Sequence, residues 1–178
     1  DGSKGYLALE PGYRESKESW GEVVRQLKRR GLKTARLFVG DGNLGLWAAV
    51  GEVYPQAQEQ LCWNHKMLNV MDAVSKKEQG EVKRHLNAMM YAESRAACLA
   101  EIGAFVAEYA AKYPKAVASL TADQEHLLTH FAFPAEHWGH LRTTNPIEST
   151  FATVKLRQRV TKGAGSRTAG LTMAFKLL

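Results

Sequence analysis

Asp41 combines an acidic side chain with a position that favours ligand binding. It follows a short apolar run, residues 35–39, and lies between Gly40 and Gly42. A run of this length predicts a buried strand, and open α/β sheets bind ligands at the carboxyl ends of their strands. The two glycines leave room for the backbone to bring a carboxylate close to a metal ion or a phosphate. The alternative is a simple turn, in which Asp41 makes a local hydrogen bond with the backbone.

Glu148 is the second acidic candidate, at the end of segment 143–148, which has the sequence TTNPIE. Asn145 suits the N-cap of a helix, and Pro146 suits the first helical position. The same helical face then carries Glu148, Lys155 and Arg159, so the carboxylate could hold a metal ion beside a phosphate backbone. Two alternatives stay open. Glu148 closes a capping box at its own helix start, or the face is an ordinary salt-bridging surface.

Cys62 and His65 have the spacing of a metal-ligand pair, and His137 and His140 supply a second pair. Together they could form a structural zinc site. The alternative is a buried cysteine with a hydrogen-bonded histidine and two loop histidines without a special role. The second interpretation is favoured, because the pairs lack an intervening zinc-finger pattern. Zinc is therefore not an expected cofactor.

The positive charge of the chain is concentrated in its last quarter. The formal net charge is +6, and residues 136–178 carry +5 of it, which leaves +1 for the other 135 residues. Such asymmetry predicts a surface that contacts a polyanion, and the alternative is a basic tail that only aids solubility. The candidate DNA-binding residues are Arg142, Lys155, Arg157, Arg159 and Lys162.

Composition narrows the class of protein further. Hydrophobic residues make up 45% of the chain, enough for a packed core, and no apolar run reaches the length of a membrane span. Two cysteines far apart in the sequence do not make a disulfide framework, so a reducing cytoplasm is the expected compartment.

Strands and helices alternate in the first third of the chain, which predicts an α/β sheet. Residues 5–9 are expected to form a strand. A capping-box signal at Ser19 and Glu22 predicts a helix with Trp20, Val23, Val24 and Leu27 on its apolar face. A strand at 35–39, a helix over about 46–53 and a strand over about 57–62 follow.

The pattern changes near residue 65. Residues 65–130 have helical periodicity with expected breaks near Gly80 and Pro114, and residues 131–141 are expected to be a loop. One helix should begin at residues 145–146, with Ile147, Phe151 and Val154 packed inward, and residues 168–178 should be helical. The expected division is a partial α/β core at 1–64, a helical insertion at 65–135, and a catalytic-helix and basic segment at 136–178.

Four segments resemble the Mutator-type transposases of bacterial insertion sequences. They are residues 16–32 (SKESWGEVVRQLKRRGL), 37–42 (LFVGDG), the part of 55–69 that has the sequence EQLCWNHKMLN, and 141–159 (LRTTNPIESTFATVKLRQR). The last is the most specific, since Thr-Thr-Asn-x-Ile-Glu before a basic helix is typical of that family.

The resemblance implies a ribonuclease H-like fold, a mixed sheet with an α-helical insertion, which here lacks its first strand. It also implies a D-D-E acid triad that binds two Mg²⁺ ions, with Asp41 as the second acid and Glu148 as the third. Cys62, His65 and Asn145 match supporting positions of the family motifs. The first acid and the site-specific DNA-binding region lie upstream in such proteins, so the chain is expected to be the C-terminal part of a transposase with an incomplete metal site.

The function so implied is DNA cleavage and strand transfer during transposition. The expected partners are double-stranded DNA and, in the full-length protein, further copies of the chain, in the cytoplasm of a bacterium and associated with its nucleoid. One alternative is a catalytically inert remnant that binds DNA or an intact transposase. Another is a zinc-stabilised α/β interaction module.

Overall fold

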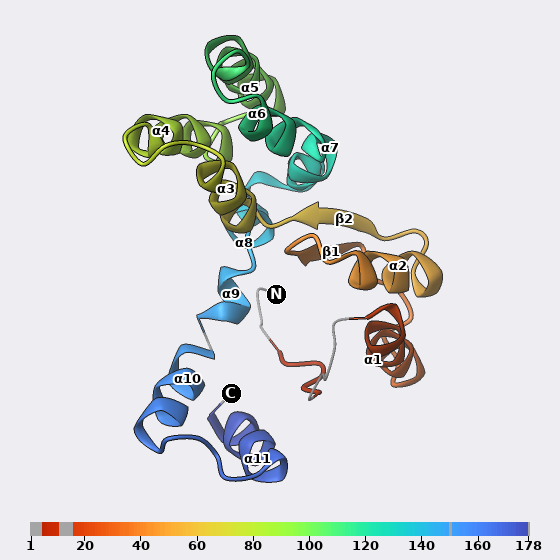
Figure 1. The fold of residues 1–178 in the computed structure, drawn as a ribbon. Coiled ribbons are helices and arrows are strands. Elements are labelled where there is room, and N and C mark those ends of the chain that lie inside the picture. The colour runs from red at the N-terminus through yellow and green to blue at the C-terminus, as the bar shows by residue number, and fades with distance from the viewer. Residues whose placement is uncertain (1–4, 11–15, 150, 178) are drawn as a thin grey trace. The chain divides into compact units, whose positions relative to one another are not determined.

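The computed structural model describes residues 5–10, 16–149 and 151–177 (Figure 1). It is a mainly helical α/β structure whose described part contains one small sheet, in which β1 (Leu37–Gly40) pairs with β2 (Gln58–Leu61) as parallel neighbours. The chain forms two compact units. The first unit comprises the described residues of 1–38, 43–57 and 145–178, and the second comprises 39–42 and 58–144. Within the described residues, no helix has both the length and the apolar character that a membrane crossing requires.

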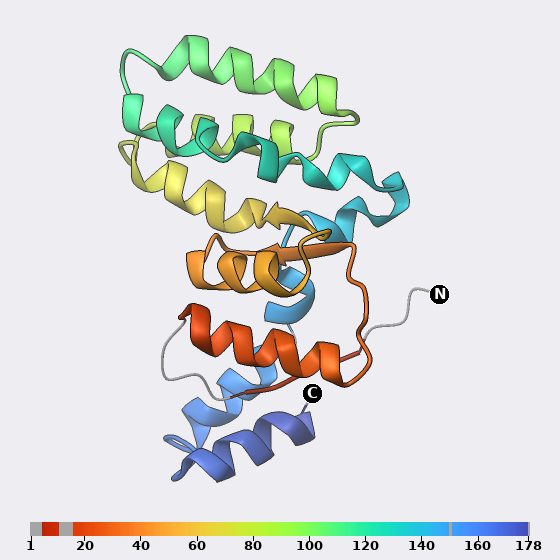
Figure 2. The same cartoon turned by 90° about the vertical axis from the view of Figure 1, so that its right-hand side faces the viewer.

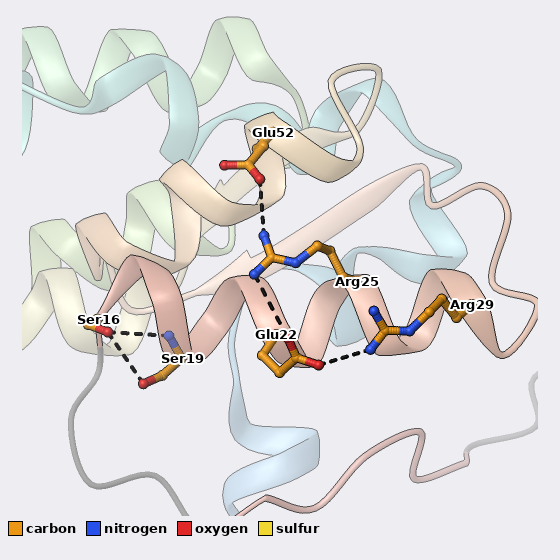
Figure 3. Close-up of polar contacts among 6 residues, drawn as sticks. All are labelled: Ser16, Ser19, Glu22, Arg25, Arg29 and Glu52. Atoms are coloured by element: carbon orange, nitrogen blue, oxygen red, sulfur yellow. Dashed lines mark hydrogen bonds and ion pairs between the residues drawn. The ribbon is translucent and has the colours of Figure 1, made fainter.

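The first unit begins with α1 (Lys17–Arg29), which lies beside α2 (Leu44–Val53) in both ribbon views (Figures 1 and 2). The N-cap of α1 is Ser16, whose hydroxyl oxygen accepts a hydrogen bond from the backbone N–H of Ser19 at 3.2 Å (Figure 3). The prediction that Ser19 caps this helix is therefore wrong. The helix starts earlier because Ser16 already satisfies one of its free N–H groups.

Close packing between α1 and α2 depends on a small residue. At Gly45, a Cβ atom would lie 2.8 Å from both the Lys17 nitrogen and the Ser16 carbonyl carbon, a distance that only glycine avoids. Val24 of α1 and Val53 of α2 are buried together with Tyr54. Apolar contact, rather than the exposed ion pairs drawn in Figure 3, holds the two helices together.

Residues 5–9 do not form the expected strand. Among the described residues the sheet contains only β1 and β2, so this segment has no strand to pair with. The side chains of Tyr6 and Leu7 are about half exposed. The Leu7 carbonyl accepts a hydrogen bond from Arg30 Nη1 at 2.6 Å instead of one from a neighbouring strand.

The described residues of 145–160 form two helical segments where the sequence predicted one helix. α9 (Asn145–Glu148) ends at Glu148, and α10 (Phe151–Val160) follows, packed against α11 (Arg167–Leu177). Val154 is buried as expected, but Ile147 is 59% exposed, so the predicted apolar stripe is wrong at that position. The stripe assumed one continuous helix, and a break changes the direction of every side chain beyond it.

The second unit is helical after β2. Its elements are α3 (Trp63–Asp72), α4 (Gln79–Met90), α5 (Arg95–Tyr109), α6 (Pro114–Thr121), α7 (Gln124–Leu127), η1 (Thr129–Ala132), η2 (Ala135–His137) and α8 (Trp138–Leu141). Its fully buried side chains include Trp63, Leu86, Met89, Phe105 and Leu120, so the largest core lies among these helices.

One local expectation for the second unit is wrong, and two are confirmed. Residues 131–141 form short helices rather than a loop, whereas the expected break near Gly80 is present, because α3 ends at Asp72 and α4 begins at Gln79. Pro114 does begin a helix, at the position where its missing N–H costs nothing.

Candidate functional site

Asp41 lies directly beyond the carboxyl end of β1, next to the end of β2. The Cys62 N–H donates to the Gly40 carbonyl at 2.7 Å, so the two strands end at the same edge. Gly42 has a φ of +101°, a backbone conformation that residues other than glycine rarely adopt. The predicted strand is present, and Asp41 follows it at the sheet edge where α/β proteins bind ligands.

A polar pocket of about 130 Å³ lies at this edge. A water molecule takes about 30 Å³ in the liquid, so the pocket has room for about four. Carboxylate and amide side chains supply most of its polar groups, with one ammonium group. The pocket is lined by Asp41, Gly42, Leu61, Cys62, Lys66, Asn69 and Asp123.

Lys66, Asn69 and Asp123 are site residues that the sequence analysis missed. Cys62 is the N-cap of α3, and Lys66 and Asn69 follow it at intervals of four and seven residues, the spacing of one helical face. That spacing was a usable signal once Cys62 had been singled out. Asp123 carried no such signal, because it is 57 positions from Lys66 and reaches the pocket only through tertiary packing.

Cys62 is almost completely buried and binds the segment before α9. Its sulfur accepts hydrogen bonds from the Thr144 N–H at 3.3 Å and the Thr144 hydroxyl at 3.2 Å. Burial acts to raise the pKa of the Cys62 thiol, but the hydrogen bonds from Thr144 and His65 outweigh it, so the pKa is lowered overall. The Trp63 N–H also donates to the Arg142 carbonyl, at 2.9 Å. The start of α3 therefore holds residues 142–144 in place.

A buried polar network supports β2 from the side of α7 and η1. The Gln60 side chain donates to the Leu127 carbonyl at 3.0 Å and accepts from the His130 N–H at 2.7 Å. The Trp63 indole N–H donates to the same Leu127 carbonyl. Burial lowers the pKa of His130 to about 4, so its imidazole is neutral at pH 7. The network fixes the strand end that carries Cys62.

The four candidate zinc ligands are not gathered into one site. His137 and His140 are exposed, and across the described residues their ring nitrogens do not form a ligand group with Cys62 and His65. Cys62 instead uses its sulfur as a hydrogen-bond acceptor. Within the described residues, Cys62 and His65 therefore do not share a site with His137 and His140, and the expectation about zinc stays a prediction.

The basic candidates fall into two groups. Lys155, Arg157, Arg159 and Lys162 are exposed on α10 or directly after it. Arg142 differs, because its Nη1 donates to the Met90 carbonyl at 2.8 Å and its guanidinium carbon lies 4.4 Å from the centre of the Tyr91 ring. Only the first group therefore presents unburied positive charge along a helix.

The remaining candidates lie in α9. Asn145 is its first residue, and the Asn145 carbonyl accepts from the Ser149 N–H at 2.9 Å. Glu148 is exposed and ends this single helical turn. The predicted helix start at Asn145 is therefore present.

Fold and site together define an α/β protein whose paired strands end at a pocket carrying carboxylates. The sequence profile described as "Transposase, Mutator family" matches residues 1–169. The chain belongs to the Mutator family of transposases, which confirms the resemblance seen in its motifs.

Named relatives agree with this assignment. The chain is 52% identical over 178 residues to the transposase for insertion sequence element IS6120 of Mycolicibacterium smegmatis, covering all of this chain and 55% of that protein. It is 47% identical over 179 residues to the transposase for IST2 of Acidithiobacillus ferrooxidans, covering all of this chain and 60% of the relative. The transposase for ISRM5 of Rhizobium meliloti is 31% identical over 162 residues, which are 91% of this chain and 41% of the relative. The chain thus spans a little over half the length of the first two relatives.

Proposed function

We propose that this chain carries the part of an insertion-sequence transposase that cleaves DNA at the element's ends and joins it to target DNA. The observation that supports this most directly is Asp41, which lies at the carboxyl end of a strand and lines a polar pocket in a chain of the Mutator family. The proposed fold of the complete protein is ribonuclease H-like, with a partial core at 1–64, an insertion at 65–135 and the catalytic-helix segment at 136–178.

Asp41 and Glu148 are proposed as the second and third acids of a D-D-E triad, with the first supplied from further upstream in the complete protein. The pocket beside Asp41 offers carboxylate and amide oxygens, the ligands that Mg²⁺ prefers, and space for part of a hydration shell. The donor set therefore fits a hard divalent cation. When bound, a pair of Mg²⁺ ions would activate the attacking oxygen and stabilise the leaving oxygen.

The exposed bases of α10 are proposed to hold double-stranded DNA. Lys155, Arg157, Arg159 and Lys162 can neutralise phosphates without reading the base sequence, which makes such binding sensitive to salt. Arg142 would contribute from the second unit, with its guanidinium on Tyr91. The complete protein is proposed to act as a homo-oligomer at DNA in the bacterial cytoplasm.

A chimera tests this function. These 178 residues would replace the 55% of the Mycolicibacterium smegmatis transposase that they match. In the presence of Mg²⁺, we expect the chimera to cut DNA that carries the IS6120 ends. Cutting should cease when EDTA removes the Mg²⁺. Asp41→Asn and Glu148→Gln should each slow cutting about a hundredfold or more, since a catalytic metal ion contributes several kcal/mol of transition-state stabilisation.

Asp72→Asn is the matched control, because Asp72 is an exposed acid at the end of α3 that does not line the pocket. It should leave cutting unchanged. A chimera in which Asp41→Asn cuts at the normal rate would contradict the role of Asp41.

The second candidate function is DNA binding without cleavage by the 178-residue polypeptide alone. The exposed bases of α10 favour it, because phosphate binding does not need a metal site. The isolated chain should bind duplex DNA weakly and neither nick nor join it in Mg²⁺ or Mn²⁺. Charge reversal at Lys155 and Arg159 should weaken binding, whereas Asp41→Ala should hardly change it in EDTA. Cleavage by the isolated chain that is lost with Asp41→Ala would show that its metal site is complete.

A further inference from the structure

The pocket beside Asp41 contains a buried lysine for which the proposed acid triad and the basic helix give no role. Only 10% of the Lys66 side chain is exposed. Its ammonium nitrogen donates to the Ser119 carbonyl at 2.9 Å and to the Asp123 carboxylate at 2.8 Å. Ser119 lies in α6 and Asp123 directly precedes α7, so helices that follow α3 fix the position of this ammonium.

Stability alone does not account for a lysine at this position. Removing an ammonium group from water is expensive, and one ion pair with a half-exposed carboxylate does not fully compensate for it. An apolar side chain of similar length would pack between α3 and α6 without that cost, and lysine is rarely buried for this reason. A buried lysine on the wall of a functional pocket therefore indicates a need for positive charge there.

The charges of the pocket show when that ammonium would attract an anion. At pH 7 the formal charges are negative on Asp41 and Asp123 and positive on Lys66, so one negative charge remains in excess. This excess repels a phosphate. A divalent cation on Asp41 would change the balance to one positive charge, and a phosphate oxygen would then be attracted to the pocket.

We propose that Lys66 binds a phosphate oxygen of the DNA strand that enters this pocket, and that Asp123 is the positioning residue that holds the Lys66 ammonium in place. The assignment rests on the proposed function of Asp41. The hydrogen bonds to Ser119 and Asp123 use two of the three N–H donors of Lys66, and within the described residues the third remains for a phosphate oxygen. The helical segment after α3 thereby contributes to substrate binding as well as to the core.

The salt dependence of DNA binding tests the contact with phosphate. The affinity of the chain for a short fluorescein-labelled duplex would be measured by anisotropy over a range of NaCl concentrations, at a fixed low concentration of Mg²⁺. Each lost phosphate contact lowers the slope of log affinity against log salt by about 0.9. Lys66→Met should show that decrease in Mg²⁺ and a smaller one in EDTA, where the excess negative charge already repels phosphate.

Lys28→Met is the matched control. Lys28 is also partly buried, and its ammonium donates to the Val53 carbonyl at 2.8 Å, but it lines no part of the pocket. The Lys28→Met substitution removes the same charge from the chain, and it should leave the slope of log affinity against log salt as in the wild type. Equal slopes for Lys66→Met and Lys28→Met would overturn the proposal.

Asp123→Asn separates positioning from simple electrostatics by the sign of its effect. Removing a negative charge from the pocket should tighten DNA binding if Asp123 only repels phosphate. If Asp123 holds Lys66 in place, binding in Mg²⁺ should weaken and the salt slope should fall. Tighter binding by Asp123→Asn would overturn the positioning role. This variant keeps the side-chain shape and one acceptor oxygen, so it decides the matter if circular dichroism shows that Lys66→Met does not fold.

The inference and the proposed function fail in different ways. If Asp41→Asn abolishes cutting by the chimera while Lys66→Met leaves the salt slope unchanged, only the role of Lys66 is wrong. If Asp41→Asn leaves cutting unchanged, the proposed function fails whatever the salt slope shows.

Discussion

The Glu52 ion pairs of the first unit and the Gln60 and Lys66 hydrogen bonds of the second unit differ in how far they are buried. In the first unit, Glu52 accepts from Lys17 and Arg25 at 3.1 and 3.0 Å, and all three side chains are about half exposed. In the second unit, Gln60 and Lys66 make their hydrogen bonds inside the protein. Exposed ion pairs contribute little to stability, whereas a buried polar group that loses its partner destabilises the fold. The contacts of Gln60 and Lys66 should therefore matter far more to stability than those of Glu52.

The largest expected loss is at Gln60. Gln60→Leu leaves the His130 N–H without its acceptor and removes one donor from the Leu127 carbonyl, both in a buried site. We expect the free energy of unfolding to fall by about 3 kcal/mol in urea denaturation, since each buried unsatisfied group costs about 1–3 kcal/mol. Gln58→Leu, at an exposed position of the same strand, should change stability by less than about 0.5 kcal/mol. Similar effects of the two substitutions would remove the contrast between the units.

A smaller loss is expected at Asp123. Asp123→Ala leaves the buried Lys66 ammonium with only the Ser119 carbonyl as a partner. Breaking a fully buried pair costs about 3–5 kcal/mol, and because Asp123 is half exposed we expect about 2 kcal/mol by thermal or urea unfolding. Glu125→Ala provides the comparison, since Glu125 pairs with Arg95 at 2.7 Å on the surface. An equal loss from both variants would show that burial of Lys66 has no special consequence.

Acid should weaken the second unit through His130. Its pKa is lowered from 6.5 to about 4, so the unfolded chain binds the proton first as the pH falls. The stability contributed by neutral His130 is complete above about pH 6.5 and is lost as the pH falls towards 4. The free energy of unfolding changes through this group by no more than about 1.4 kcal/mol per pH unit. In His130→Phe the overall stability should be lower, but this part of the pH dependence should disappear. A pH profile parallel to that of the wild type would assign the acid sensitivity to other groups.

The smallest effect is expected at Glu52. Glu52→Gln removes the ion pairs with Lys17 and Arg25, and both are exposed to solvent. We expect a loss below about 1 kcal/mol, and an even smaller one at high salt, where screening already weakens the pairs. A loss comparable to that of Gln60→Leu would mean that surface charge, not the Val24 and Val53 contact, holds α1 to α2.

Local sequence signals predicted the elements of the site that are themselves local. The apolar run at 35–39 predicted the first strand, and with it the position of Asp41 directly after that strand. The helix start at Asn145 could also be predicted from the sequence, because the signals for a helix N-terminus depend on a few adjacent residues. Each of these features is decided by neighbours within about four positions in the sequence.

The errors arose where two local signals competed or where a distant partner decided the outcome. Ser16 and Ser19 are both acceptable caps, and only the backbone geometry selects Ser16. Residues 5–9 have the composition of a strand, but a strand needs a neighbour to pair with. Asp123 joins the pocket only because α3 packs against α6, which no spacing between residues 66 and 123 could have indicated.

The hydrogen bonds to Cys62 make its thiol a reporter of local opening. Cys62 is inaccessible while Thr144 donates to its sulfur, so an alkylating reagent can react only when residues 142–144 separate from the start of α3. Cys98, the other cysteine, is buried in α5, and burial raises its pKa to about 12. Its reaction would require the helices of the core to separate. The rate at which iodoacetamide modifies Cys62 in the native protein therefore reports how readily the segment before α9 detaches, without any engineered probe.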